Sequence, residues 1–549
     1  MRFAFFVLPV LFCTCGFARA DGVHRPVADR WVHLRNDLTT DAKLAFSEDV
    51  IRRAAKSGYT GVLWDAAVGA EGFDHDAWDT ARRARLAKAK RLCDDLGLEI
   101  VPLVWSVGRA HSILHYDPNL GETTPVRDVP YVVKGGKAVF VPEPAPAIRL
   151  PSGRFEPGVT YKSGDFAPKK FRRYRVSAKM RLNDVRNAPK PHLYFWRPLG
   201  DETHKYPPSR ICYARITKAL EPKNTDWQDF CLDLQTRDRE LCCLWGGCTP
   251  VEGTTVDFKD WKFEEMGLCR VLRGPGAPFA VKSADGKTLY EEGRDYAVPA
   301  GLPPHPTKDE LHARGPSLEL TIPKGSRIRD GERILIDAYE LVEVGPRQFS
   351  ACMSDPRLYD YFRESAKVIR ELFAPKKVMF SSDEIRAAGT CALCESRKTD
   401  LAHIFADCVN RQKRIISDEI PGVTVYAWSD MFVPCRNAIR SYELCADTTF
   451  EGSADLVDKD IVMAAWGGSP RKDEIDFLRA KGFRMIGCGY YDAKTMDGAW
   501  KWRDAYDANP EFIGLMYTTW TRPDGKYDLL EDWGRLLNLP PDAVREPLP

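Results

Sequence analysis

Residues 376–386 read KKVMFSSDEIR, and this stretch organises the interpretation of the whole chain. The apolar run 378–380 is followed by two serines and then by the adjacent acids Asp383 and Glu384. Helix-like segments precede and follow it, so the pattern predicts a buried strand with carboxylates at its carboxyl end. In parallel α/β barrels chemistry takes place at that end of the strands. The alternative is a solvated loop after a strand, so the rest of the chain has to decide between the two.

Downstream of this stretch, strands and helices alternate. Ser354 or Asp355 can cap a helix that has Pro356 in its first turn. Predicted strands then lie at 378–384, 423–432, 460–468, 483–492 and 512–520, separated by predicted helices at 401–418, 473–481 and 497–508. Strands separated by single helices indicate βα units and a parallel sheet.

The same rhythm is present near the amino end. Predicted strands at 30–37, 59–66 and 98–105 are separated by a helix for which Ser47 is the expected cap and by a basic helix at 79–96. Three strands here and five downstream make eight. We therefore predict an α/β fold, a TIM (β/α)8 barrel interrupted after its third strand.

The segment between the two barrel portions has a different pattern. Residues 141–156 are rich in Pro and Gly, and short alternating strands follow, which predicts an all-β, jelly-roll-like sandwich. It resembles the carbohydrate-binding modules attached to glycosidases, and Trp196, Trp227 and Trp245 could stack on sugar rings or lie in its core. The expected units are a signal peptide (1–20), first barrel part (21–140), inserted sandwich (141–270), β-rich connection (271–350) and second barrel part (351–549).

The amino terminus and the composition limit the class of protein. An apolar run at 3–17 followed by Ala18-Arg19-Ala20 predicts a signal peptide cleaved after Ala20 and hence an exported protein, in the periplasm, at the cell surface or outside the cell. No later run predicts a membrane span. The net charge of +2 and the lack of a basic, aromatic-interleaved segment argue against nucleic-acid binding.

The cysteines give a weak signal. Cys391 and Cys394 form a CxxC pair, but no second pair follows to complete a zinc ribbon. A local disulfide or two free thiols is therefore expected rather than a metal site, and no cofactor is predicted. The oligomeric state is not predicted.

Aromatic and acidic residues recur at the predicted strand ends. A barrel gathers these ends, so carboxylates could bind or protonate sugar hydroxyls while aromatic faces hold the ring. Besides the acidic pair, the candidate residues are Arg35, Trp428, Asp430, Trp466, Tyr490, Tyr491, Asp492 and Trp520, with Asp65 and Trp105 at two further strand ends.

The stretch SDPRLYDYFRESAKVIRELFAPKKVMFSSDEI, residues 354–385, resembles the helix and fourth strand of family 20 glycoside hydrolases, the β-N-acetylhexosaminidases. The tryptophans closing strands five, six and eight, and the Tyr and Asp closing strand seven, match that family's order. The resemblance covers about 30–115 and 350–535 and not the middle of the chain.

What this resemblance implies is retaining, substrate-assisted cleavage of terminal β-linked N-acetylhexosamine from an oligosaccharide or polysaccharide. Glu384 would be the general acid, and Asp383 would orient the 2-acetamido group that attacks C1. Tyr490 or Tyr491 would bind the acetamido oxygen, and Arg35 would bind sugar hydroxyls. The aromatic strand ends would line the site.

The chain departs from the family in two places. Ser381-Ser382 stand where the family usually has His and glycines, and Thr521-Arg522 follow Trp520 where it often has Trp-x-Glu. Two alternatives therefore stay open. One is a glycosidase of another specificity with Asp430, Asp492 or Glu340 as nucleophile. The other is a barrel that binds sugar without cleaving it.

Overall fold

The eight predicted barrel strands form one closed parallel sheet. The computed structural model describes residues 24–66, 79–156, 158–183, 191–198, 210–217, 225–238, 241–248, 255–299, 306–307, 310–311, 315–344, 348–439, 449–490, 492–520 and 527–543. The order of strands around the barrel is β1-β2-β3-β18-β19-β20-β21-β22. Their bounds are β1 Asp29–Arg35, β2 Gly61–Asp65, β3 Glu99–Val104, β18 Lys377–Phe380, β19 Thr424–Trp428, β20 Val462–Trp466, β21 Met485–Tyr490 and β22 Phe512–Thr518.

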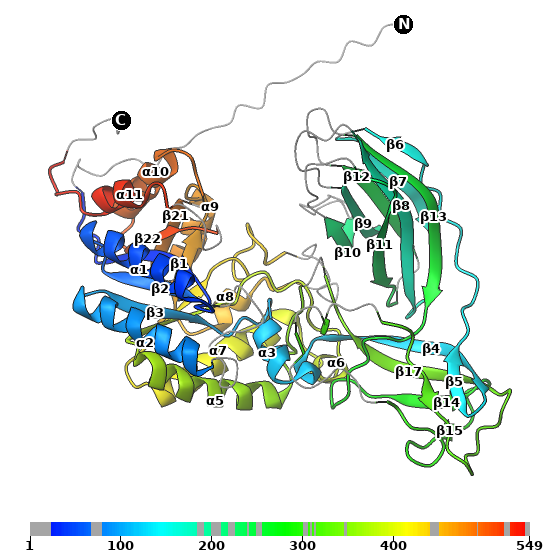
Figure 1. Ribbon diagram of the computed structural model, residues 1–549. Coiled ribbons are helices and arrows are strands. Elements are labelled where there is room, and N and C mark those ends of the chain that lie inside the picture. Colours follow the sequence, from blue (N-terminus) through cyan, green and yellow to red (C-terminus); the bar gives the residue numbers. More distant parts are fainter. Residues whose placement is uncertain are drawn as a thin grey trace, which may run out of the picture.

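Helices cover the outside of the barrel (Figure 1). They are α1 Asp41–Lys56, α2 Thr80–Asp95, α5 Pro356–Phe373, α7 Leu401–Glu419, α8 Ser453–Leu456, α9 Lys472–Ala480, α10 Asp497–Ala508 and α11 Leu530–Leu537. Asp355 caps α5 by accepting the Arg357 amide at 2.9 Å, with Pro356 as the first helical residue, so that prediction is confirmed. The apolar stripe of each helix packs on the outer face of the sheet.

The start of α1 was predicted wrongly. Thr40, and not Ser47, is the residue that caps the helix, and its side chain accepts the Lys43 amide. Ser47 is fully buried in the second turn, where its hydroxyl donates to the Lys43 carbonyl and accepts a bond from the Asn36 side chain. A serine inside a helix can bond back to the preceding turn as well as cap, and the local sequence does not distinguish the two.

The barrel interior is a packed core. Alternate strand residues point inward and form one buried cluster, in which Trp31, Tyr426 and Trp428 are the largest members. The ring centroids of Trp31 and Tyr426 lie 4.8 Å apart. Such layers fill a TIM barrel, so open space for a ligand can exist only above them, at the strand ends.

Between β3 and β18 the chain leaves the barrel and forms three antiparallel sheets. Two of them have four strands each, in the orders β10-β9-β12-β7 and β11-β8-β13-β6, and share one apolar core. Their strands are β6 Gly153–Phe155, β7 Thr160–Phe166, β8 Arg173–Asn183, β9 Pro191–Pro198, β10 Arg210–Thr217, β11 Gln228–Gln235, β12 Cys242–Cys248 and β13 Thr255–Met266. These antiparallel strands lie between residues 153 and 266, within the range predicted to form a sandwich.

The third sheet has six strands, in the order β15-β14-β17-β4-β5-β16. They are β4 Thr123–Lys134, β5 Lys137–Phe140, β14 Ala280–Ser283, β15 Leu289–Tyr290, β16 Leu320–Thr321 and β17 Arg333–Leu341. The sheet thus joins the strands just before the sandwich to those just after it, because β4 pairs with β17 from Thr123 to Val132.

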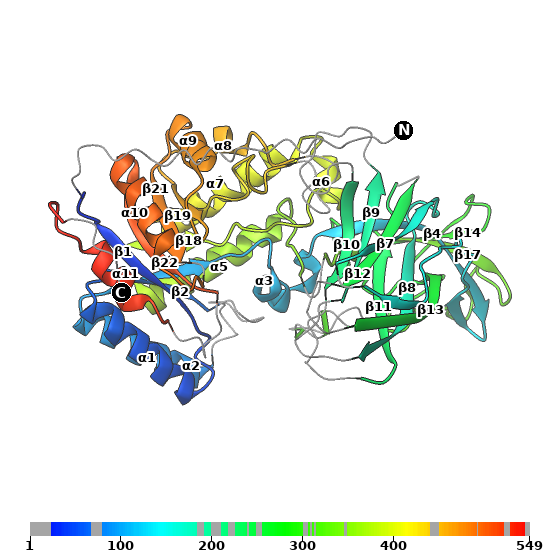
Figure 2. The same cartoon turned by 90° about the horizontal axis from the view of Figure 1, so that it is seen from above.

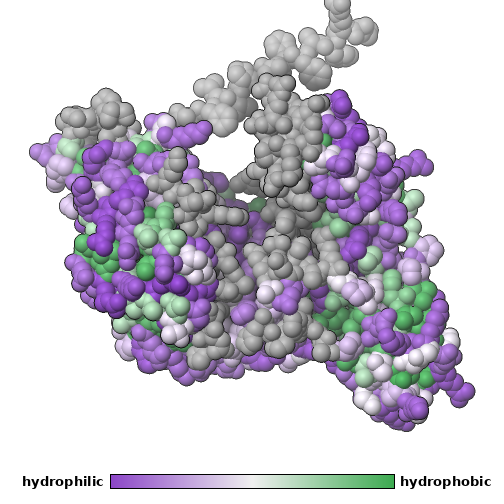
Figure 3. Space-filling view, in the orientation of Figure 1, coloured by the Kyte–Doolittle hydropathy of each residue, from purple (hydrophilic) through white to green (hydrophobic). Residues whose placement is uncertain are grey.

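The barrel and the antiparallel sheets lie side by side in both views, with α3 (His111–Tyr116) between them (Figures 1 and 2). The short helix α6 (Ala392–Ser396) also lies at this junction, and a 3-10 turn, Pro118–Leu120, leads into β4. Figure 3 shows hydrophobic residues gathered over the lobe that holds β14 and β15. No helix in the described part of the chain is long and apolar enough to cross a membrane.

Candidate active site

The strand that carries the acidic pair ends earlier than predicted. β18 ends at Phe380, and Glu384 has a φ of 47°, in the left-handed region that non-glycine residues seldom adopt. The turn removes the alternation of a strand, which would send Asp383 and Glu384 to opposite faces. Ser381 donates a hydrogen bond of 2.7 Å to Asp383. Strained backbone of this kind is concentrated at functional sites.

Two arginines hold the Glu384 carboxylate. Arg109, in the loop after β3, contacts Oε2, and Arg386 Nη2 lies 3.1 Å from Oε1. Burial alone would raise the pKa of Glu384, but the charges of Arg109 and Arg386 outweigh it, so its pKa lies below the ordinary value. Glu384 is therefore an anion in the ligand-free protein at neutral pH.

Asp430, two residues beyond β19, is the third carboxyl of this group. Its Oδ2 accepts the Glu384 backbone amide at 3.1 Å and the Asn437 side chain at 2.7 Å. Burial, and then the charge of Asp383, raise the pKa of Asp430 to about 8. Burial likewise raises the pKa of Asp383, with Arg109 opposing it. Neighbouring carboxyls in opposite protonation states are what an acid and an anionic partner require.

The loop after β3 presses directly on the acidic pair. A Cβ on Gly108 would lie 2.3 Å from the Asp383 carbonyl oxygen. Gln348 ties the two segments together, since its side-chain amide donates to the Glu384 carbonyl at 2.8 Å and to the Gly108 carbonyl at 3.2 Å. Arg386 Nε in turn donates to Gln348 at 2.8 Å. The position of Glu384 is therefore set by contacts from several distant segments.

The predicted arginine and two tryptophans meet at the strand ends. Arg35, at the end of β1, donates to Asp65 at 3.0 Å and to the Trp520 carbonyl at 2.9 Å, and its guanidinium lies 5.1 Å from the Trp520 ring centroid. The rings of Trp428 and Trp520 are 5.9 Å apart. Trp428 is 2% exposed, so it supports the floor of the site more than it offers a face to a ligand.

Trp466 and Trp105 have different surroundings. Arg436 lies 4.5 Å from the Trp466 ring centroid and pairs with buried Glu474, so one face of that indole is covered. Trp105 is not at the site. It stacks on Phe362 and Phe380 in the core beneath the strand ends. A tryptophan at a strand end can point into the site or into the core, and its position in the sequence does not distinguish the two.

The residues predicted at the end of strand seven are placed only in part. Tyr490 ends β21, but its side chain lies outside the described part of the structure, as do Tyr491 and Arg522. Asp492 has a φ of 57° and accepts the Trp520 backbone amide at 3.1 Å. Asp492 therefore positions the Trp520 segment.

Glu340 is excluded as a partner of the acidic pair. It lies in β17, outside the barrel, where it accepts bonds from the Cys269 amide at 2.7 Å and the Gln235 side chain at 2.8 Å. Two of the predicted sandwich tryptophans have cations over their rings. Lys259 and Arg181 lie 4.3 and 4.7 Å from the ring centroid of Trp227, and Lys162 lies 4.6 Å from that of Trp245. The side chain of Trp196 lies outside the described residues.

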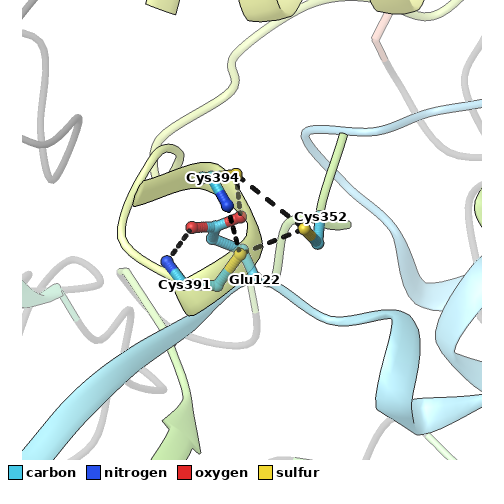
Figure 4. A group of neighbouring side chains, drawn as sticks. All are labelled: Glu122, Cys352, Cys391 and Cys394. Carbon is cyan, nitrogen blue, oxygen red and sulfur yellow. Dashed lines mark hydrogen bonds between the residues drawn. The ribbon is translucent and has the colours of Figure 1, made fainter. Parts of the chain in front are cut away.

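Arg109, Gln348 and Gly108 were not predicted from the sequence. Arg109 follows β3 and could have been found from its place after a strand end, whereas Gln348 lies far from any barrel strand. Glu122 and Cys352 were also missed. They lie with Cys391 and Cys394 in a buried group, in which one ligand atom from each residue lies within 4.8 Å of the others (Figure 4). Both members of the predicted CxxC pair are free thiols.

No family model matches the chain. No curated protein is similar to it in sequence. Among solved structures, a family 20 β-N-acetylglucosaminidase aligns with 93% of this chain and 69% of its own, at 8% identity and a TM-score of 0.36. A mutant Streptomyces plicatus β-hexosaminidase in complex with its product aligns with 93% of this chain and 62% of its own, at 11% identity and a TM-score of 0.34.

A rhamnosidase from a Novosphingobium species aligns with 94% of this chain and 58% of its own, at 10% identity and a TM-score of 0.31. This chain therefore spans less than two thirds of the length of the last two proteins. The likenesses are distant ones at the level of the fold and do not assign an activity.

Proposed function

We propose that this protein is a glycoside hydrolase that acts at the strand ends of its barrel. The observation that carries the proposal is the group formed by Asp383, Glu384 and Asp430. Three carboxyls share one site, in which Asp430 is fully buried and the other two are partly buried. Two arginines lower the pKa of Glu384, and burial raises the pKa of Asp383 and of Asp430. Glycosidic cleavage needs such a pair of acid and anion beside a sugar-binding surface.

The specific reaction we propose is retaining, substrate-assisted removal of terminal β-linked N-acetylhexosamine. Asp383 orients the acetamido group of the substrate, and Glu384 donates a proton to the leaving oxygen. Arg35 and Asp65 bind sugar hydroxyls beside Trp520, with Trp428 beneath and Tyr490, Tyr491 and Trp466 around the ring. Because Arg109 and Arg386 favour the anion of Glu384, substrate binding has to displace Arg109 before Glu384 can hold a proton.

One observation favours a second mechanism. Asp430 carries the raised pKa of about 8 and Glu384 the lowered one, which is the order expected if Asp430 were the acid and Glu384 a protein nucleophile. This version would act on glycosides that have no 2-acetamido group. The two versions share the site and differ in which carboxyl attacks C1.

A panel of chromogenic glycosides, led by N-acetyl-β-D-glucosaminide and -galactosaminide, tests the activity itself. Hydrolysis of these two, with inhibition by an N-acetylglucosamine thiazoline, supports the substrate-assisted reaction. Labelling of Glu384 by a mechanism-based 2-fluoro sugar, located by peptide mass spectrometry, supports the protein nucleophile instead. Binding to a glycan array without turnover of any glycoside would overturn both and leave a sugar-binding barrel.

We further propose that the sandwich is an accessory module inserted after β3 that binds sugar, and that the protein is exported. The predicted units are 21–140, 141–270, 271–350 and 351–549, with a signal peptide at 1–20 whose residues lie outside the described structure. The cations over Trp227 and Trp245 reduce the ring surface that is open to a sugar. Cleavage is tested by amino-terminal sequencing of the protein secreted from a heterologous host.

A further inference from the structure

A second group of reactive side chains lies apart from the three carboxyls. Glu122, Cys352, Cys391 and Cys394 converge from three segments, and one ligand atom from each lies within 4.8 Å of all the others (Figure 4). Glu122 precedes β4, Cys352 precedes α5, and the other two flank the start of α6. All four side chains are buried.

The hydrogen bonds of Glu122 aim one of its oxygens at the sulfurs. Oε1 accepts the backbone amides of Thr390 and Cys391, at 2.6 and 3.0 Å, and the Thr390 hydroxyl at 3.0 Å. Oε2 faces the Cys394 sulfur at 3.8 Å. One oxygen is thus held by protein hydrogen bonds, and the other faces the thiols. This arrangement is typical of a carboxylate that binds a metal ion and is oriented by second-sphere hydrogen bonds.

Glu122 has no cationic partner among the residues that the structure describes. It is 1% exposed, and within the described part of the chain no lysine or arginine forms an ion pair with it. A buried carboxylate without a positive partner is costly. A bound cation would supply that charge.

The spacing of the ligand atoms suits a tetrahedral zinc ion. With zinc–sulfur bonds of about 2.3 Å, two sulfurs of a tetrahedron lie about 3.8 Å apart. The Cys352 and Cys394 sulfurs are 3.8 Å apart. Those of Cys352 and Cys391 are 3.1 Å apart, so this pair has to open by a fraction of an ångström around the ion. Neither pair is at the bonding distance of a disulfide, about 2.05 Å.

We propose that Glu122, Cys352, Cys391 and Cys394 bind one structural zinc ion. Three thiolates and a carboxylate are a soft, closed, four-ligand set, which favours zinc over magnesium or calcium and leaves no open position for catalysis. On binding, the thiols release their protons to solvent and no electron is transferred. The amide of Cys394 donates to the Cys391 sulfur at 3.3 Å, which helps to disperse the charge of that thiolate.

The ion would fasten the loop that carries the acidic pair. Residues 381–390 run from the end of β18 directly to Cys391, so the site anchors the far end of that loop to the start of β4 and to the segment before α5. Cys394 also lines a pocket of about 590 Å³ with Gly389, Glu395 and Leu401, which offers a route for the metal.

Metal content measured by inductively coupled plasma mass spectrometry tests the proposal on the full-length protein, expressed without a histidine tag in zinc-supplemented medium. One zinc per chain is expected, released by a thiol-modifying mercurial. Replacement with Co²⁺ is expected to give thiolate-to-cobalt charge-transfer absorption and the visible bands of a tetrahedral centre, a signature that does not depend on any variant folding.

Cys352→Ala and Cys394→Ala are expected to lower the zinc content at least about tenfold. Cys93→Ala, which removes another buried thiol outside the group, is the matched control and is expected to leave it unchanged. Zinc-free wild-type protein from supplemented medium would overturn the proposal. So would a Cys352–Cys391 disulfide found by peptide mass spectrometry in protein purified without reductant, or cobalt spectra without thiolate bands.

Discussion

Glu384, which is partly exposed, and Glu122, which is fully buried, are two glutamates whose charges have different surroundings. The guanidinium groups of Arg109 and Arg386 surround Glu384 and lower its pKa. Glu122 has only backbone amides, a hydroxyl and thiols around it, and burial raises its pKa well above the ordinary value. The two sites lie at opposite ends of residues 381–391, and both hold that segment in place.

The difference points to a catalytic role for the site around Glu384 and a structural role for the site around Glu122. The charges of nearby arginines set the protonation state of Glu384. Its pKa can therefore rise when a substrate displaces one of these arginines. No charged side chain of the described residues pairs with Glu122, and the proposed zinc ion would complete its site. Changes at the first site should therefore appear mainly in turnover, and changes at the second mainly in stability.

The largest effect is expected from Glu384→Gln compared with Glu122→Gln. Loss of a general acid or nucleophile should lower kcat/KM about 10²- to 10⁴-fold with little change in melting temperature. Glu122→Gln should lower the melting temperature and the metal content and leave turnover within a few fold.

Glu531→Gln is the matched control for Glu384→Gln, because Glu531 also pairs with an arginine, Arg53, through two bonds of 2.7 and 3.0 Å. Steady-state kinetics and calorimetry distinguish the outcomes. Unchanged hydrolysis in Glu384→Gln would reject its catalytic assignment.

Gly108→Ala probes how closely the loop after β3 supports the acidic pair. The new methyl group would lie 2.3 Å from the Asp383 carbonyl, so the loop has to shift. Displacement of a catalytic group by about 1 Å can cost about 10²-fold in rate, and we expect a loss of that order in kcat. Gly315→Ala, where nothing lies within 4 Å, is the control. Equal kinetics in the two variants would show that the contact does not position Asp383.

Arg35→Lys keeps the charge and removes the planar group that donates to Asp65 and lies on Trp520. We expect KM to rise about 10-fold with kcat changed much less, because a point charge cannot replace a fork of donors. Arg411→Lys is the matched control, since Arg411 lies 4.7 Å from the Tyr359 ring centroid, outside the site. A fall in kcat with constant KM would instead assign Arg35 to the transition state.

The pH dependence of stability gives a further test of the site. Asp430 holds its proton up to about pH 8 in the folded protein, against an ordinary value of 3.8. The folded state therefore binds more protons between these values, and stability should fall as pH rises through that window.

Calorimetry from about pH 5 to pH 8 should show a falling melting temperature in the wild type and a flatter one in Asp430→Asn. Asp360→Asn, at an exposed position of α5, is the control and should keep the wild-type slope. Identical slopes in all three proteins would contradict the raised pKa.

The barrel could be predicted because its signals are local. Each strand is a short apolar run, and helix ends carry residues such as Asp355 and Gly97 whose role depends on their immediate neighbours. The predicted strand beginning at 378 ended too late because Ser381 and Ser382 are buried without being part of the sheet. A hydrophobic pattern indicates that residues are buried, but it does not show whether the buried residues belong to a strand.

The site could be predicted only where its residues end strands. Arg35 ends β1, and Asp383, Glu384 and Trp520 follow within four residues of a strand end. Arg109 and the group around Glu122 depend on contacts between segments hundreds of residues apart, for which periodicity and spacing hold no information. The CxxC pair was visible, but its other two ligands were not.

The long excursion between β3 and β18 has a consequence for how the protein is made. About 270 residues separate two strands that pair side by side. At about 5–20 residues per second, a ribosome needs roughly 15 to 55 seconds to cross that distance. Throughout that interval the first three strands wait with an open edge while the antiparallel sheets can already fold. A chaperone that binds nascent strands should therefore engage this protein early, before the fourth barrel strand is synthesised.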